Sequence, residues 1–203
     1  MEYDLIVGID PSLSNTGVVA YDVATDKYRA TWLRTGKLKC GDPGRLVWIA
    51  EQAALCIADR IPEANVLLAI EDHAGQQGHA AVNVAVQWFI RATVASFYNA
   101  ETLVIAPSSG KKFGTGRGNM DEKERCAVIW AKWGHHAGAM KPNPHVADAM
   151  SLCQLARCWA GVGSGWEPWQ VSSALNQNQS KGAPQRMTHN DTASLRAARE
   201  GGE

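Results

Sequence analysis

Two short apolar segments of this chain are each followed directly by a carboxylate. Residues 5–9 (LIVGI) precede Asp10, and residues 66–70 (VLLAI) precede Glu71. Segments with apolar residues on both faces are typical of strands buried inside a sheet. A buried, unpaired carboxylate is costly, so each acid needs a backbone N–H group, a cation or a metal ion beside it. Asp10 before Pro11 also fits an ordinary turn, so other parts of the sequence must distinguish these two interpretations.

The pattern of the first 160 or so residues predicts a mixed α/β domain. The predicted strands cover residues 4–10, 17–22, 28–35, 66–70 and 102–105, and the predicted helices cover residues 43–58, 80–98, 120–133 and 143–159. Short connections favour an antiparallel meander for the first three strands. A helical crossover then allows the first and fourth strands to lie adjacent and parallel in a five-stranded sheet. Residues 107–119, rich in Gly, Ser and Lys, are predicted to form a loop.

In such a sheet, Asp10 and Glu71 lie side by side at the carboxyl ends of neighbouring strands, where ligands bind in folds of this class. Two adjacent carboxylates repel each other unless a cation bridges them or one is protonated. Helix 143–159 contributes His145 and Asp148, which are three residues apart and therefore share a face. These four side chains suit two divalent cations about 3.5–4 Å apart, the arrangement that cleaves phosphodiesters. Oxygen ligands favour Mg²⁺ or Mn²⁺.

Each of these residues also has an ordinary structural interpretation. Taken singly, Asp148 fits an acid on a helix surface, His145 fits a helix N-terminus, and Glu71 fits the partner of an arginine. Asp72 points to the opposite face of its strand from Glu71 and is left out of the predicted site.

Composition restricts the class of protein. The net charge is zero, but basic residues gather in 27–45 and 107–132, where they either bind phosphate or form solvated faces. The five cysteines show no C-x-x-C spacing, which favours reduced thiols over a zinc site. No apolar run is long enough for a membrane helix and the acidic N-terminus is not a signal peptide, so a cytoplasmic protein is expected. Residues 164–203, rich in Gln, Asn, Ser and Gly, are predicted to be a partly disordered tail after a domain at 1–163.

Four segments, in this order, resemble motifs of RuvC-like Holliday junction resolvases, members of the ribonuclease H superfamily. They are GIDPSLSNTG, LLAIED, APSSGKKFGTGRGNMDEKE and HVADAMSL, which together place the resemblance over about residues 4–160 and suggest a phage-type member. The resemblance implies a ribonuclease H-like fold. It also implies that Asp10, Glu71 and Asp148 are metal-binding acids, with His145 at a position where many members have a fourth acid and some have histidine.

The resemblance further implies that Lys111 and Lys123 hold phosphate near the cleavage point. One departure concerns the segment after Glu71, DHAGQQGHAA, which carries none of the aromatic residues that often help the family to open the junction centre. Strict junction specificity is therefore a weaker expectation than cleavage itself.

The expected activity is two-metal hydrolysis of branched DNA, above all four-way junctions, leaving 5′-phosphate ends. The two-fold symmetry of a junction favours a homodimer, for which helix 80–98 with Trp88 and Tyr98 is the candidate face. One alternative is a nuclease of the same fold with broader specificity for flaps, forks or D-loops, and another is a non-catalytic binder of branched DNA. GIDPSLSNTG also resembles the phosphate loop of actin-like ATPases. Such an ATPase needs a second domain that 203 residues cannot hold.

Overall fold

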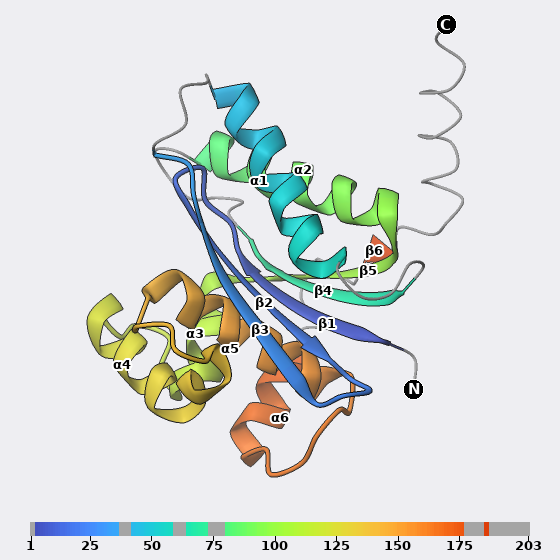
Figure 1. Cartoon of the computed structure of the whole chain (residues 1–203). Helices are drawn as coiled ribbons and strands as arrows, with labels where there is room; N and C mark the ends of the chain where they lie inside the picture. Colours follow the sequence, from blue (N-terminus) through green and yellow to red (C-terminus); the bar gives the residue numbers. More distant parts are fainter. Residues whose placement is uncertain (1–2, 37–41, 59–63, 73–79, 177–184, 187–203) are drawn as a thin grey trace, which may run out of the picture.

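A computed structural model describes residues 3–36, 42–58, 64–72, 80–176 and 185–186. These residues form a sheet with the strand order β3-β2-β1-β4-β5-β6 (Figure 1). The strands are β1 Leu5–Asp10, β2 Asn15–Asp22, β3 Lys27–Arg34, β4 Asn65–Glu71, β5 Asn99–Ile105 and β6 Gln185–Arg186. The helices are α1 Asp42–Ala58, α2 Ala80–Phe97, α3 Pro107–Thr115, α4 Glu122–Trp133, α5 Pro144–Trp159, α6 Pro168–Leu175 and a 3₁₀ helix, Gly134–Ala137.

The predicted five-stranded sheet is confirmed. β1 pairs antiparallel with β2 and parallel with β4, β2 pairs antiparallel with β3, and β4 pairs parallel with β5. The two-residue strand β6 extends this sheet by pairing antiparallel with β5. No helix of the described segments is long and apolar enough to cross a membrane.

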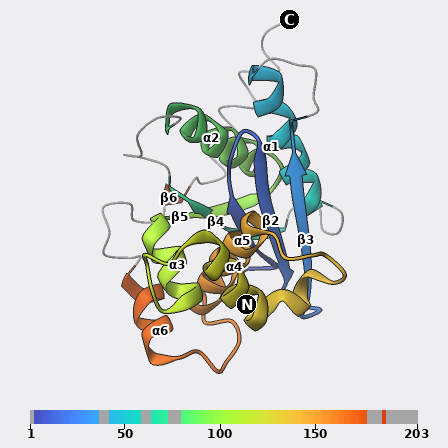
Figure 2. The same cartoon turned by 90° about the vertical axis from the view of Figure 1, so that its left-hand side faces the viewer.

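Helices cover both faces of the sheet. α1 and α2 lie on one face, and α3, α4 and α5 lie on the other (Figure 1, Figure 2). The strands alternate accordingly: Leu5, Val7 and Ile9 of β1 belong to the core under α1 and α2, whereas Ile6 belongs to the core under α5. Asp10, an even-numbered residue like Ile6, therefore projects toward α5.

The predicted loop at 107–119 is wrong, because residues Pro107–Thr115 form helix α3. Pro107 occupies a first-turn position, where proline is tolerated, and Phe113 is completely buried. Gly114 lies so close to α5 that an added Cβ atom would stand 2.7 Å from Ser151 Oγ. Glycines discourage an isolated helix, but here they allow two helices to pack closely, and that packing overrides the local preference.

Two glycines allow α5 to lie directly on the sheet. A Cβ atom on Gly8 of β1 would be 2.1 Å from the carbonyl oxygen of Ala149, and one on Gly17 of β2 would be 2.1 Å from that of His145. Any larger residue would push the helix outward. The N-terminal turn of α5 therefore reaches the strand that carries Asp10 because Gly17 has no side chain.

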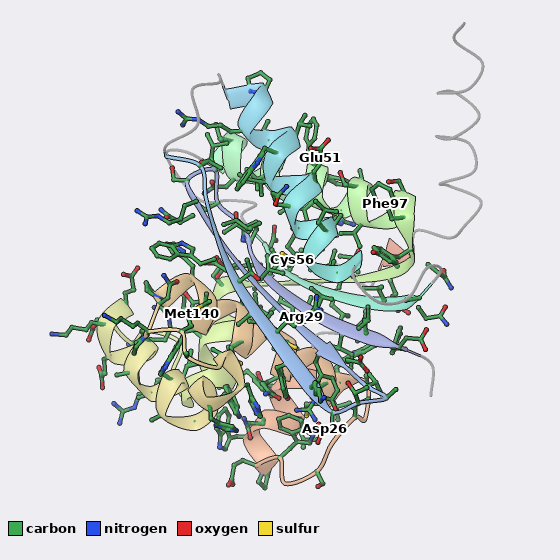
Figure 3. All side chains as sticks on the ribbon, in the orientation of Figure 1. Asp26, Arg29, Glu51, Cys56, Phe97 and Met140 are labelled. Atoms are coloured by element: carbon green, nitrogen blue, oxygen red, sulfur yellow. The ribbon has the colours of Figure 1, made fainter. Side chains whose placement is uncertain are left out.

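The outer face of α2 differs in part from the sequence-based expectation. Trp88, in the middle of α2, is 48% exposed. Phe97, the last residue of the helix, is 60% exposed (Figure 3). Tyr98, predicted to share this exposed face, is buried in the core under α1 and α2. Tyr98 follows the last residue of α2, so its ring turns inward where the helix ends.

The first part of the predicted tail packs on the domain. Trp166 and Trp169 place their ring centroids 6.0 and 6.4 Å from that of Phe113. Gln170 and Ala174 of α6 are buried, and Gln170 Nε2 donates a hydrogen bond to the Phe113 carbonyl oxygen at 3.4 Å. Residues 177–184 and 187–203 lie outside the described residues, so their predicted disorder stays a prediction.

This packing predicts different outcomes for two truncations. A chain ending at Gly163 loses the contacts of Trp166, Trp169 and α6 with Phe113, and we expect its free energy of unfolding to fall by roughly 2–4 kcal/mol. A chain ending at Asn176 keeps these contacts and loses only the two-residue strand β6, so its urea midpoint should lie much closer to that of the full chain. Equal stability of the chain ending at Gly163 and the full chain would show that α6 adds nothing to the core.

Within the described residues, Cys126, Cys153 and Cys158 form no disulfide bond, and the predicted reduced state of all five cysteines stays a prediction. Cys40 lies outside the described residues.

Candidate active site

Asp10 and Glu71 lie beside each other at one edge of the sheet. Ile9 of β1 is in register with Ile70 of β4, and each acid is the residue that follows and ends its strand. Paired residues of parallel strands project to the same face, so both carboxylates face α5. Asp10 is 7% exposed and Glu71 is 8% exposed. The side-by-side arrangement inferred from the two apolar segments is therefore what the structure contains.

The N-terminal turns of α5 bring two further side chains to this edge. The side chain of Asn143 caps the helix by accepting a hydrogen bond from the Val146 backbone N–H group at 3.1 Å. His145 Nδ1 lies 2.9 Å from Asp10 Oδ2. Asp148, one turn further along, raises the pKa of Glu71 through its negative charge, so its carboxylate lies within electrostatic reach of Glu71.

The three carboxylates and the imidazole strongly influence one another. The pKa of Glu71 is raised to about 9. Burial is the largest cause, and repulsion by the Asp10 charge and a hydrogen bond with Asp10 add to it. Burial also raises the pKa of Asp148, with a further contribution from Asp10. The hydrogen bond to Asp10 raises the pKa of His145, against the opposing effect of burial. In the absence of a bound cation, the site therefore retains protons that isolated side chains would release.

Arg125 is a site residue that the sequence-based reasoning missed. It lies in α4, where Nε donates to Asp148 Oδ1 at 2.7 Å and Nη2 donates to Asp148 Oδ2 at 2.8 Å. Both side chains are largely buried, with 9% of the Arg125 side chain and 15% of the Asp148 side chain exposed. The only sequence signal was its place in the basic segment 107–132, because contacts between α4 and α5 are not readable from residue spacing.

The two predicted lysines are placed differently. Lys111 is half-buried in α3, and its positive charge lowers the pKa values of both Glu71 and Asp148. Lys123 is exposed in the first turn of α4, beside the N-cap residue Asp121. Arg125, two residues further along the same helix, is the basic residue of α4 that contacts Asp148.

Within the described residues, no three His, Cys, Asp or Glu side chains stand close enough to hold one metal ion as they are. The chemistry of the donors nevertheless fits a divalent cation at Asp10, Glu71 and His145. Glu71 is buried against a second carboxylate with its pKa raised to about 9, and a cation would remove the repulsion that causes this shift. Asp148 fits as a fourth ligand only if Arg125 gives up at least one of its two hydrogen bonds to the Asp148 carboxylate, which frees an oxygen for the cation.

The Arg125–Asp148 pair yields a prediction about stability. Arg125→Met leaves a buried carboxylate without its counter-charge, and we expect the free energy of unfolding in EDTA to fall by roughly 3–5 kcal/mol. The double variant Arg125→Met with Asp148→Asn should recover most of this loss, since no unpaired charge remains. Urea unfolding of the parent, both single variants and the double variant measures the coupling energy. Additive effects of the two substitutions would mean that the pair does not contribute as a unit.

The fold resembles that of solved structures more clearly than the sequence resembles known sequences. No family model matches the sequence, and no curated protein matches it. Among solved structures, RuvC of Thermus thermophilus superposes with a TM-score of 0.57 at 17% identity, covering 78% of this chain and 97% of RuvC. The T. thermophilus RuvC structure in complex with a Holliday junction substrate gives a TM-score of 0.56 at 15% identity, over 77% of this chain and 96% of that one. This chain therefore has the ribonuclease H-like fold of the RuvC structures.

Proposed function

We propose that this protein is a divalent-metal-dependent endonuclease that resolves four-way DNA junctions and leaves 5′-phosphate ends. The observation that carries the proposal is the buried pair Asp10–Glu71, with His145 beside it, at the edge of a RuvC-like sheet. The carboxylates of this site lie close together and have raised pKa values. We expect them to bind cations, because a cation removes the repulsion between them.

Each side chain has a definite role in this proposal. Asp10, Glu71, His145 and Asp148 would hold two Mg²⁺ or Mn²⁺ ions. When bound, such ions supply Lewis-acid activation of water and neutralise charge on the phosphate. Arg125 holds Asp148 in position. It would give up at least one of its two hydrogen bonds if Asp148 bound a cation.

Basic residues would position the DNA. Lys111, half-buried in α3 and close enough to lower the pKa values of Glu71 and Asp148, is suited to hold the phosphate next to the cleaved bond. Lys123, exposed on α4, would contact the backbone further from the acids. Phosphate contacts of this kind set the position of the DNA without reading its sequence.

The proposed assembly is a homodimer that presents two such sites to two strands of a junction. A junction has approximate two-fold symmetry, and an isologous dimer matches it. The exposed side chains of Trp88 and Phe97 on α2 are the apolar surface proposed for this contact.

A broader specificity is the second candidate function. The segment after Glu71 contains no aromatic residue, which favours a nuclease that also accepts flaps, forks or D-loops. Purified protein with Mg²⁺ on end-labelled four-way junction, flap, fork and linear duplex separates the two functions. Symmetric nicks in the junction alone support the resolvase, cleavage of every branched form supports the broader nuclease, and no metal-dependent cleavage of any DNA contradicts both.

His145 gives a prediction about metal preference. An imidazole must be neutral to bind a metal, and the hydrogen bond to Asp10 raises the pKa of His145 above its ordinary value of about 6.5. We therefore expect cleavage at limiting metal to decline as the pH falls toward 6, with partial recovery in excess metal.

His145→Asp should replace a nitrogen ligand by an oxygen ligand and so shift the preference from Mn²⁺ toward Mg²⁺. In excess metal the low-pH loss should weaken as well, because the cations offset the repulsion from Asp10 that would otherwise raise the pKa of the new carboxyl group. Cleavage rates of both proteins, measured across pH at several concentrations of each metal, test both expectations. If the Mn²⁺/Mg²⁺ rate ratio and the pH profile stay the same, His145 is not a ligand.

A further inference from the structure

An exposed tryptophan lies in register with the candidate catalytic aspartate. Asp10 of β1 pairs with Gly17 of β2, and Gly17 pairs with Trp32 of β3. Directly paired residues of antiparallel strands project to the same face, so Trp32 and Asp10 share the face that carries α5. Neighbouring strands are about 4.8 Å apart, so the two Cα atoms are separated by roughly 10 Å.

The surroundings leave Trp32 accessible. β3 is the outermost strand on this side of the described sheet, so nothing pairs with it beyond β2. Trp32 is 37% exposed, although the next residue, Leu33, is buried under α1 and α2. Gly17 lies between Trp32 and Asp10 and is covered by the His145 carbonyl group, so a DNA strand in contact with both side chains would pass over the first turn of α5.

An arginine stacks on this tryptophan. Arg34, two residues further along β3 and thus on the same face, places Cζ 4.5 Å from the centre of the Trp32 ring. Arg34 is itself exposed. Aromatic rings and arginine planes side by side are what bind unpaired nucleobases, by stacking and by attraction to the phosphate.

We infer that Trp32 and Arg34 form a stacking platform for an unpaired nucleobase of the DNA strand held at Asp10. The inference rests on the proposed function and adds a specificity-determining surface to it. A separation of about 10 Å corresponds to roughly three base steps of stacked DNA at 3.4 Å each. The platform therefore selects DNA whose strands separate within a few nucleotides of the cleaved phosphate, which a linear duplex does not offer.

The test uses the full-length Asp10→Asn protein, which keeps DNA intact, with Trp32→Ala, Trp32→Phe, Arg34→Ala and the control Arg29→Ala added singly. Arg29 lies on the same strand but projects to the opposite face. The probes are a four-way junction with 2-aminopurine beside the branch point, a single strand, and a linear duplex. Thermal unfolding of each variant checks that it is folded.

We expect Trp32→Ala to weaken binding of the junction and the single strand by roughly 5- to 150-fold, with less than a twofold change for duplex. Trp32→Phe should restore most of the affinity, and Arg34→Ala should show a smaller loss of the same kind. Arg29→Ala should keep the parent's preference for branched DNA, so that any loss of affinity is equal for branched and linear DNA. The parent should quench 2-aminopurine fluorescence, a direct sign of stacking that needs no variant.

Unchanged junction binding in Trp32→Ala, an equal loss on duplex, or an absence of quenching by the parent would each overturn the platform while leaving the nuclease proposal intact. A change of oligomeric state in Trp32→Ala without a selective loss of branched DNA would assign Trp32 to a protein interface instead. If the Asp10→Asn parent binds none of the three DNAs, the proposed function itself fails, and the platform with it.

Discussion

Asp10→Asn is expected to reduce metal-dependent DNA cleavage by at least two to three orders of magnitude, while junction affinity stays within about twofold. Asp10 interacts with two other residues of the candidate site, through a hydrogen bond with Glu71 and through His145 Nδ1 at 2.9 Å. Affinity for DNA rests mainly on basic residues at phosphates, and the substitution leaves these in place. Cleavage rates and binding isotherms of the same preparations measure the two effects separately.

Asp72→Asn is the matched control for this experiment. Asp72 follows Glu71 directly but lies near Arg91. Burial lowers the pKa of Arg91, and the negative charge of Asp72 partly opposes that shift. We expect Asp72→Asn to cleave at the parent rate. An inactive Asp72→Asn together with an active Asp10→Asn would show that the wrong carboxylates have been assigned to the site.

The second large effect concerns stability in the absence of metal. Glu71 has a pKa of about 9 in the folded protein and an ordinary pKa near 4.5 in the unfolded chain. Between these values the folded state keeps a proton that the unfolded state has released, so the free energy of unfolding falls as the pH rises. The raised pKa of His145 acts in the same direction, since its contribution is present at low pH and disappears as the pH rises through its folded value.

We therefore expect the metal-free protein to be more stable at pH 5.5 than at pH 8, with a slope of up to about 1.4 kcal/mol per pH unit from Glu71 alone. Glu71→Gln removes that titration, so we expect the variant to be roughly 2–4 kcal/mol more stable than the parent at pH 8 in EDTA, and to be inactive as a nuclease. Urea unfolding in EDTA across this pH range measures both quantities.

Metal addition at pH 8 should stabilise the parent more than Glu71→Gln. A cation that binds only the folded state raises the free energy of unfolding of the parent, and Glu71→Gln should lose most of this gain. A pH-independent stability of the parent, or equal stabilisation of parent and Glu71→Gln by Mn²⁺, would contradict the assignment of Glu71 as a crowded metal ligand.

The sequence by itself determined the sheet and its acidic edge. The segments ending in Asp10 and Glu71 are apolar on both faces, which requires interior strands, and a helical crossover between them makes these strands parallel neighbours. The i, i+3 spacing of His145 and Asp148 placed both on one face of α5. These properties follow from strand and helix periodicity, which is local, so they could be predicted before the structure.

Tertiary structure alone decided the features that depend on contacts between distant elements. α3 forms despite its glycines because Gly110 and Gly114 lie against α5, and Phe113 is buried beneath Trp166 and Trp169. The partner of Asp148 is Arg125, which the sequence did not single out, because only the packing of α4 on α5 determines which side chain points to the acids. The position of Trp32 opposite Asp10 likewise depends on strand register across β2. Residue spacing carries no record of such register or packing, since both arise from the shapes of side chains that meet only in the folded chain.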